Sequence, residues 1–212
     1  GDVKGRIKLS APRTFADAPI GQSLIDFAAA HPDIVLDINL DDRFVDLVEE
    51  GFDLAIRIAR LENSSLIARR LAPFSVKVCA APALIERRGA PRRPQDLADL
   101  PCIIDTNGRW LSNWPFIGDD GETVTVPVSG PIEVNSPLAA RAAALAGLGF
   151  AILPDFIAAP EIEAGRLTTL FDDRMPTDAG IFAVYPHRRY LPAKVRVFVD
   201  FLVQWFRDER AP

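Results

Sequence analysis

Short strands alternate with helical segments through the first sixty residues, and this alternation most strongly limits the folds open to the chain. Three stretches show the apolar pattern of strands: GRIKLS (5–10), IVLDINL (34–40) and DLAIRIA (53–59). Helical spacing joins four residues between the first two: Ile20, Leu24, Phe27 and Ala28. The order strand, helix, strand, helix, strand predicts an α/β fold with a mainly parallel sheet and helices on its faces.

Two helices are expected between these strands. Asp17 is placed to cap the first, with Pro19 in its first turn, where a missing N–H does no harm. The second is a short helix over DDRFVDLVEEG (41–51), ended by Gly51. Its expected inward residues are Phe44, Leu47 and Val48.

The rest of the chain continues as a mixture of helices and strands. A hairpin is expected around Gly118–Gly121, because two strand-like runs flank this turn sequence. The further expected elements are a helix over 139–146, a strand over 150–153, a helix over 155–163 ended by Gly165, and a strand over 179–186. The closing helix is amphipathic and places on one face Val195, Phe198, Leu202 and Trp205.

The glycine pair Gly147-Leu148-Gly149 has the spacing of nucleotide-binding loops. In a dinucleotide fold the glycines follow a strand and open a helix, so that the helix N-terminus faces the pyrophosphate. Here the order is reversed, because a helix precedes the glycines and the strand Phe150–Leu153 follows them. The order favours Gly147 as the residue just past a helix end.

Composition is that of a soluble globular protein, with 49% hydrophobic and 25% charged residues in 212. No apolar run approaches the ~20 residues of a membrane span, and the N-terminus lacks the apolar core of a signal peptide. The net charge of −5 argues against nucleic-acid binding by this chain alone. The arginine doublets, Arg69-Arg70 among them, are interpreted as solvated surface.

Enzyme chemistry is not expected. The two histidines, His31 and His187, each lie beside a proline, and no serine nucleophile motif or metal-binding cluster is present, so we expect no cofactor and no metal. Cys79 and Cys102 lie in apolar stretches and are expected to be buried reduced thiols, with a redox pair as the alternative.

Ten stretches in order carry a resemblance to a known family: GRIKLSAP, AAHPDIVLDI, LVEEGFDLAIRI, LENSSLIARRLAP, VCAAPALIERRGAP, PQDLADLPCI, WPF, VNSPLAARAAALAGLGFAILP, GRLTTL and FAVYPHRRYLPAKVRVFVDFL. From about Gly5 to Leu202 the chain resembles the effector-binding domain of LysR-type transcriptional regulators. Two departures leave the ligand's identity open. Asn63 stands where relatives often have aspartate, and Arg13-Thr14 occupy a loop that varies with effector specificity.

The resemblance implies a two-lobed α/β fold like that of type 2 periplasmic binding proteins. Lobe I would comprise 1–80 plus 186–212 and lobe II 81–185, with crossing strands near 78–81 and 183–185, and an inducer would bind in the cleft. It also implies a cytoplasmic regulator whose winged helix-turn-helix precedes this region, so that promoter DNA is bound through that domain. A solute-binding protein of a transporter, with the same fold, is the alternative.

The effector is expected to be a small organic, carboxylate-bearing anion. Asn135 or Ser136 caps the helix that starts at Pro137, and a helix start offers free N–H groups and partial positive charge to an anion. Arg57 points away from Ile56 and can pair with a carboxylate, although an ion pair with Asp53 or a neighbouring acid is the alternative. The expected effector-binding residues are Ser10, Arg13, Thr14, Phe15, Arg57, Ile58, Thr106, Asn135 and Ser136.

The resemblance finally implies self-association, as an antiparallel homodimer of effector domains and a homotetramer of the full-length protein. Lobe I would contribute Ile20–Ala30 and Ile34–Leu40, and the partner's lobe II would contribute the helix Pro137–Ala146. Small residues in AARAAALA allow another element to approach closely. The alternative is that this helix packs only within its own lobe.

Overall fold

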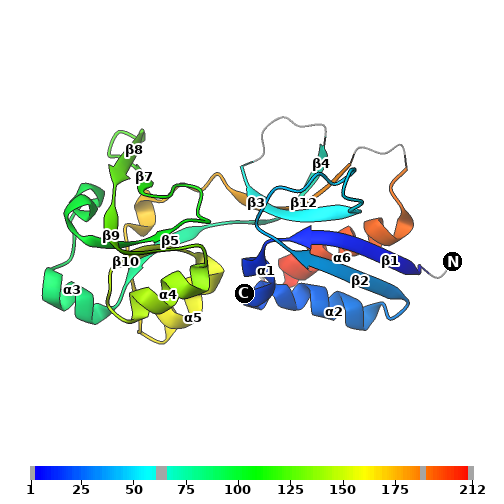
Figure 1. The fold of residues 1–212 in the computed structure, drawn as a ribbon, viewed down its shortest axis with the longest axis horizontal. Coiled ribbons are helices and arrows are strands. Elements are labelled where there is room, and N and C mark those ends of the chain that lie inside the picture. Colours follow the sequence, from blue (N-terminus) through cyan, green and yellow to red (C-terminus); the bar gives the residue numbers. More distant parts are fainter. Residues whose placement is uncertain (1–2, 61–65, 187–189, 210–212) are drawn as a thin grey trace. The chain divides into compact units, whose positions relative to one another are not determined.

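The fold was analysed in a computed structural model, which describes residues 3–60, 66–186 and 190–209 (Figure 1). Asn63 and His187 lie outside the described residues. The chain forms two compact units, Gly1–Phe74 with Asp178–Pro212 (unit 1) and Ser75–Thr177 (unit 2). Within the described residues, no helix is long and apolar enough to cross a membrane.

Unit 1 is built on a five-stranded sheet in the order β2-β1-β3-β12-β4. Its elements are β1 (Gly5–Ala11), α1 (Arg13–Asp17), the 3₁₀ turn η1 (Pro19–Gly21), α2 (Gln22–Ala30), β2 (Ile34–Leu40), β3 (Leu54–Ala59), β4 (Leu66–Pro73), β12 (Gly180–Pro186) and α6 (Ala193–Asp208). β1 runs parallel to β2 and β3, whereas β12 runs antiparallel to β3 and β4. The parallel arrangement predicted for the first three strands is confirmed, and the complete sheet is mixed.

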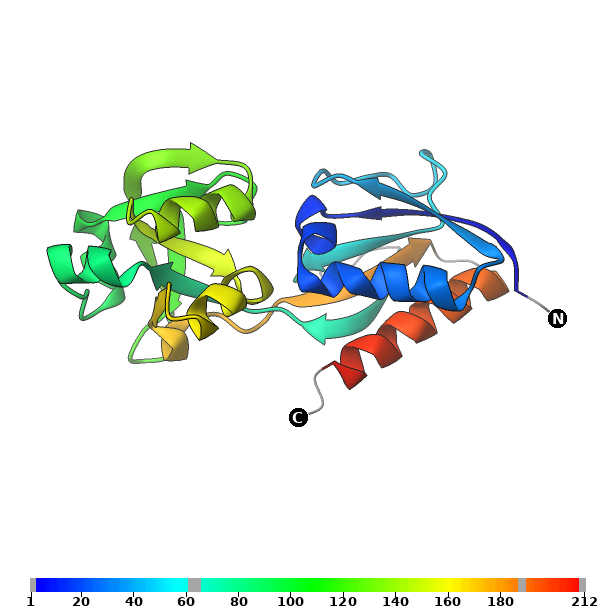
Figure 2. The same cartoon turned by 90° about the horizontal axis from the view of Figure 1, so that it is seen from below.

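The two long helices of unit 1 cover the same face of this sheet (Figure 2). The Phe27 ring of α2 meets the Phe198 ring of α6 edge-on, with 4.8 Å between centroids. The opposite face carries an apolar cluster that includes residues of the segment between β2 and β3. The cluster consists of Val45, Leu47, Phe52, Ala55 and Val184.

Unit 2 has its own sheet, in the order β11-β5-β10-β6-β9, and a separate hairpin of β7 and β8. Its elements are β5 (Val76–Ala80), α3 (Pro82–Arg88), the 3₁₀ helix η2 (Pro94–Asp99), β6 (Pro101–Asp105), β7 (Asn113–Ile117), β8 (Thr123–Pro127), β9 (Ser129–Val134), α4 (Pro137–Leu145), β10 (Phe150–Pro154), α5 (Asp155–Glu163), β11 (Thr168–Leu170) and η3 (Asp172–Arg174). α4 packs three alanines into the core of this unit, namely Ala140, Ala143 and Ala144. The hairpin and the helix over 155–163 are confirmed as predicted.

The glycine pair ends α4, as its order in the chain predicts. Gly147 has φ +74 in the left-handed region, and the N–H of Leu148 donates to the Ala143 carbonyl at 3.1 Å. Gly149 allows a close approach to β6, because a Cβ there would lie 2.8 Å from the Pro101 carbonyl oxygen. The glycines therefore end one helix and pack against a strand, and neither opens a helix.

The predicted helix over 41–51 is wrong. This segment, here called the acidic loop, contains no helix, and the side chains of Phe44 and Val48 are 82% and 70% exposed. Leu47 is buried as expected. The carboxylate of Asp46 accepts the N–H groups of both Val48 and Glu49, and such side-chain bonds compete with helical ones.

Three details of the unit 1 helices also differ from expectation. Asp17 is the last residue of α1 and caps no helix, because η1 has no side-chain cap. Ala28 is exposed on α2, where Leu24 and Phe27 are buried. On α6, Phe206 is fully in the core while Trp205 is only half-buried.

The unit boundaries fall earlier than the expected lobe boundaries at 80 and 185. β5 pairs with β10 and β11, so it belongs to unit 2 and not to the first lobe. β12 pairs with β3 and β4, so it belongs to unit 1. Sheet pairing assigns each strand whole to one unit, and the chain passes between units after Phe74 and after Thr177.

Both cysteines are free and buried, one in each of two strands of the unit 2 sheet. Burial raises the pKa of the Cys79 thiol and of the Cys102 thiol to about 12. The expectation of reduced, unreactive thiols fits this environment, because only a thiolate is a good nucleophile.

We expect Cys79 and Cys102 to resist alkylation by iodoacetamide in the native protein at pH 8, where both stay protonated. Both should react once the chain is unfolded in urea, and the mass increase reports the number of modified thiols. Native reactivity should rise only as pH approaches 12, since the pKa of each thiol is raised. Rapid labelling of folded protein at pH 8 would contradict the burial of these side chains.

Candidate functional site

The carboxyl ends of parallel strands form the first candidate region, in unit 1. In open α/β sheets, ligands bind beyond this edge. β1 ends at Ala11, whose carbonyl accepts the N–H of Asp41 just after β2, so the two strand ends lie together. Ser10 is buried on β1, next to that end.

The first three residues of α1 have different environments. Arg13 is exposed and bound to Asp42, through its backbone N–H at 3.1 Å and its Nε at 2.9 Å. This hydrogen bond and the charge of Asp42 raise the pKa of Arg13. Thr14 is half-buried in α1, while Phe15 is completely buried and packs against Phe206. The structure therefore places Phe15 in the core of unit 1.

Arg57 projects from the same face of the sheet as Ser10. Ser10 is in register with Ala55, and Arg57 lies two residues further along β3. Ile58 faces the other way, in register with Ile181. Arg57 and Ile58 therefore lie on opposite faces of the sheet, as the alternating pattern of the strand predicts.

The Arg57 guanidinium is half-buried, and this burial lowers its pKa. Its Nη2 donates to the Val45 carbonyl at 3.2 Å, and its Cζ lies 4.5 Å from the centre of the Phe44 ring. The alternative partner, Asp53, instead accepts the backbone N–H of Lys8 at 2.9 Å. Within the described part of the chain, no carboxylate forms an ion pair with Arg57.

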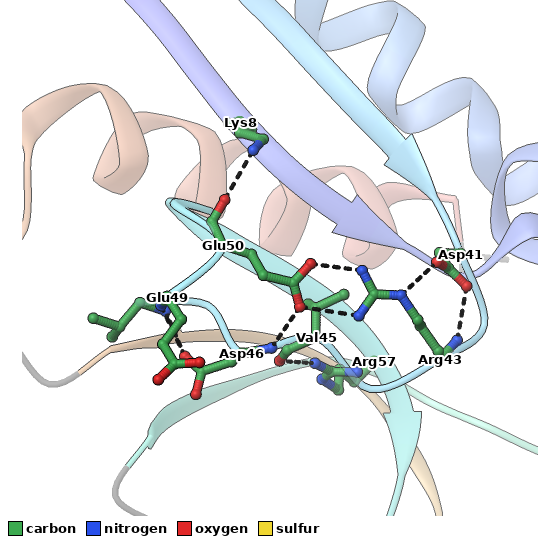
Figure 3. Close-up of polar contacts among 9 residues, drawn as sticks. Lys8, Asp41, Arg43, Val45, Asp46, Glu49, Glu50 and Arg57 are labelled. Carbon is green, nitrogen blue, oxygen red and sulfur yellow. Dashed lines mark hydrogen bonds and ion pairs between the residues drawn. The ribbon is translucent and has the colours of Figure 1, made fainter.

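Two acids of the acidic loop, Asp41 and Glu50, are bound by another arginine (Figure 3). Arg43 donates to both oxygens of Glu50, at 2.9 and 2.6 Å, and its Nε donates to Asp41 at 2.9 Å. Hydrogen bonds from Arg43 lower the pKa of both acids, for Asp41 chiefly the bond from the Arg43 backbone N–H at 3.0 Å and for Glu50 the side-chain bonds. Lys8 also fixes the loop, by donating its Nζ proton to the Glu50 carbonyl at 2.9 Å. The network keeps the loop's shape without neutralising Arg57.

The second candidate region lies at the carboxyl ends of β6 and β9, in unit 2. Asp105 and Val134 are in register in parallel strands, and the N–H of Thr106 donates to the Val134 carbonyl at 2.8 Å. Thr106 and Asn135 are exposed beside each other as a result. The structure thus brings together the unit 2 residues that the sequence singled out.

Ser136 is the cap of α4. Its Oγ accepts the N–H of Ala139 at 3.2 Å, and Pro137 occupies the first turn, as expected. Asn107 was not foreseen, although its side-chain amide donates to the Asn135 carbonyl at 2.9 Å and so fixes the turn into the helix. The turn sequence Asn107-Gly108 was the signal available for it.

Unit 1 also has a surface hollow of ≈ 570 Å³ that the sequence did not reveal. It lies between η1, α2, the end of β2 and the end of α6. Its lining includes Ile25, Ile38, Leu40, Trp205 and Glu209. No group of residues suited to a metal ion occurs among those that the structure describes.

Comparison with known proteins places this fold in a family. The family model for the LysR substrate binding domain matches residues 1–207. The chain belongs to the LysR family. An uncharacterized HTH-type transcriptional regulator of Haemophilus influenzae is 34% identical over 194 residues, which cover 91% of this chain and 67% of that protein.

Further LysR-family likenesses agree in sequence and structure. The HTH-type transcriptional regulator PtxR of Pseudomonas aeruginosa is 33% identical over 95% of this chain and 64% of its own. The full-length structure of AphB, a virulence activator of Vibrio cholerae, superposes with a TM-score of 0.84 at 26% identity, covering 96% of this chain and 69% of that one. The regulatory domain of CrgA from Neisseria meningitidis gives 0.81 at 25%, covering 96% and 100%.

These likenesses confirm the expected α/β fold of the type 2 periplasmic-binding-protein kind, and they identify an effector-binding domain of a LysR-type regulator. The sequence spans about two thirds of the length of the curated relatives. Those relatives are named as transcriptional regulators and not as enzymes or transport proteins.

Proposed function

We propose that this LysR effector domain senses a small organic anion and thereby controls the DNA binding of the regulator to which it belongs. The observation that carries the proposal is Arg57. A half-buried guanidinium without a carboxylate partner among the described residues is suited to an incoming carboxylate.

In unit 2, the start of α4 supports the same choice of ligand. The first turn of a helix has backbone N–H groups without intrahelical partners and a partial positive charge. Ser136 uses one of these groups, and the exposed hydroxyl of Thr106 lies near the same strand ends. We propose that the effector contacts Ser10, Thr14 and Arg57 in unit 1, and Thr106, Asn135 and Ser136 in unit 2.

Arg13, Phe15 and Ile58 have smaller roles in this proposal. Arg13 forms an ion pair with Asp42, Phe15 is buried in the core, and Ile58 faces away from Ser10. A transporter's solute-binding protein remains a weaker alternative, because the relatives are named as transcriptional regulators.

Variants of Arg57 and Ser136 test the site. A thermal-shift screen of organic acids would first identify a ligand, since a ligand at 100 times its Kd adds about 2.7 kcal/mol to stability. Arg57→Ala and Ser136→Ala should then each weaken binding about 10- to 150-fold in isothermal titration, through loss of a charge-assisted hydrogen bond.

Ser129→Ala is the matched control and should leave Kd unchanged. Ser129 is the exposed first residue of β9, at the opposite end of this strand from Asn135. Because Ser136 caps α4, urea unfolding of each variant must show that the chain is folded at the titration temperature. If Arg57→Ala and Ser136→Ala both retain the Kd of the parent chain, the site lies elsewhere.

We also propose that the domain self-associates through α2 and β2 of unit 1, against α4 of a second copy. Two large apolar side chains that line the surface hollow, Ile25 and Leu40, are exposed. Leu40→Asp should shift the sedimentation profile towards monomer. Val35→Asp is the control, because Val35 is exposed on the other face of the same strand. Equal self-association of the parent chain and Leu40→Asp would contradict this interface.

A further inference from the structure

Three side chains lie in a row across the sheet of unit 1, on the face that α2 and α6 leave free. Phe182 of β12 is in register with Arg57 of β3 on one side and with Arg70 of β4 on the other. Residues in register on neighbouring strands project from the same face. The row therefore consists of an aromatic ring with an arginine on each side.

A register shift in β4 gives Arg70 this position. Ile181 pairs with Ala72 but Phe182 pairs with Arg70, so Leu71 has no partner and is 7% exposed. Such bulges change the direction of neighbouring side chains. Without the shift, Leu71 would stand opposite Phe182.

The two members of the Arg69-Arg70 doublet consequently differ in environment. Arg69 pairs with Asp200 of α6 at 2.6 Å, on the helix-covered side. Arg70 projects from the other side, beside Phe182. Both arginines are exposed, as the sequence suggested, but they lie on opposite faces of the sheet.

Because Gly180 has no side chain, the Phe182 ring and the Arg70 guanidinium can both lie close to its backbone. A Cβ at this position would lie 2.9 Å from Phe182 Cε2 and 3.1 Å from Arg70 Nε. Both groups thus lie above the same residue of β12. The Phe182 ring itself packs against the apolar cluster around Ala55 and Val184.

Neither arginine of the row is neutralised within the described residues. Asp41 and Glu50 are bound by Arg43, Asp42 by Arg13, and Asp178 by Arg60 at 2.6 Å. Phe44 covers the face of the Arg57 guanidinium at 4.5 Å and Nη2 donates to the Val45 carbonyl, so further N–H groups can still donate to a ligand at the guanidinium edge. The row therefore has two cations separated by an apolar surface.

We propose that Arg57 and Arg70 together bind a small dicarboxylate, whose hydrocarbon middle lies over Phe182. Two strands flanking a third are about 10 Å apart, which suits two separate carboxylates better than one. Each guanidinium presents paired N–H donors that match a carboxylate. Because it shares Arg57, this inference rests on the proposed function and specifies its ligand as doubly charged.

Succinate and butyrate are matched probes, since they share a four-carbon chain and differ in one carboxylate. Isothermal titration of the parent chain should show succinate binding up to about fivefold tighter than butyrate, because one exposed ion pair usually adds no more than that. Arg70→Gln should remove this difference and leave butyrate unchanged. Arg69→Gln, one residue away on the other face, should change neither affinity.

Gly180→Ala provides a second variant, because the added methyl group must displace the ring or the guanidinium, and it too should weaken succinate selectively. Four results would each overturn the inference. They are equal affinity for the two probes, no succinate binding, tighter binding of inorganic phosphate than of succinate, and an unchanged succinate affinity in Arg70→Gln. If monocarboxylates bind and respond to Ser136→Ala while Arg70→Gln has no effect, only the dicarboxylate assignment fails. If no organic anion binds, the proposed function fails with it.

Discussion

Replacing Gly130 with alanine is expected to prevent unit 2 from folding stably. A Cβ at Gly130 would lie 1.8 Å from the carbonyl oxygen of Cys102 and 2.7 Å from its backbone nitrogen. These are backbone atoms of β6, so no side chain can rotate away. β9 would have to separate from β6, in the region where the register between them shifts.

The expected cost exceeds about 4 kcal/mol, a large part of the 5–15 kcal/mol that stabilises a typical domain. Urea unfolding followed by circular dichroism would measure it. Gly121→Ala is the matched control in the same unit, because Gly121 has φ +81 but nothing within 4 Å of the new Cβ. Strain there should cost only about 1–2 kcal/mol. Similar losses in the two variants would show that the close approach at Gly130 is not the cause.

Elements specified by local pattern were predicted well. The helix Asp155–Glu163 and the strand Gly180–Pro186 lie where apolar spacing and flanking glycines indicate them. The unit 2 part of the candidate site could also be predicted, because Thr106 follows the apolar strand Pro101–Asp105 and Asn135 precedes the helix that starts at Pro137. Parallel neighbours bring such residues to one edge.

Two kinds of feature could not be predicted: those decided by competition between side-chain and helical hydrogen bonds, and those decided by the pairing of strands distant in the sequence. In the acidic loop, Phe44, Leu47 and Val48 have helical spacing, but no helix forms. Backbone N–H groups donate to the Asp46 side chain, and these bonds compete with helical ones. The register shift at Leu71, which sets the direction of the Arg70 side chain, depends on pairing with β12 and cannot be recognised in the sequence of β4. The surroundings of Arg57 depend on both features, so they could not be predicted from the sequence.

Replacing Phe27 with alanine is expected to destabilise unit 1 by about 3–5 kcal/mol, the usual cost of deleting a buried phenyl ring. The ring is completely buried and lies 4.8 Å from the Phe198 ring and 5.3 Å from the Phe201 ring, both on α6. α2 lies near the start of the chain and α6 near its end, so this contact joins two helices that are far apart in the sequence. Of the other large apolar residues of α2, Leu24 is already buried in the core and Ile25 is 59% exposed, so we expect neither to fill the space.

Ile25→Ala on the same helix is the control for this variant and should cost less than about 1 kcal/mol. The free energy of unfolding of both variants can be measured in urea, with the α6 residue Trp205 as a fluorescent reporter. Its indole N–H donates to Asp26 of α2 at 2.8 Å, so separation of α6 from α2 changes its surroundings. A loss for Phe27→Ala no greater than that for Ile25→Ala would mean that the α2–α6 contact does not hold unit 1 together.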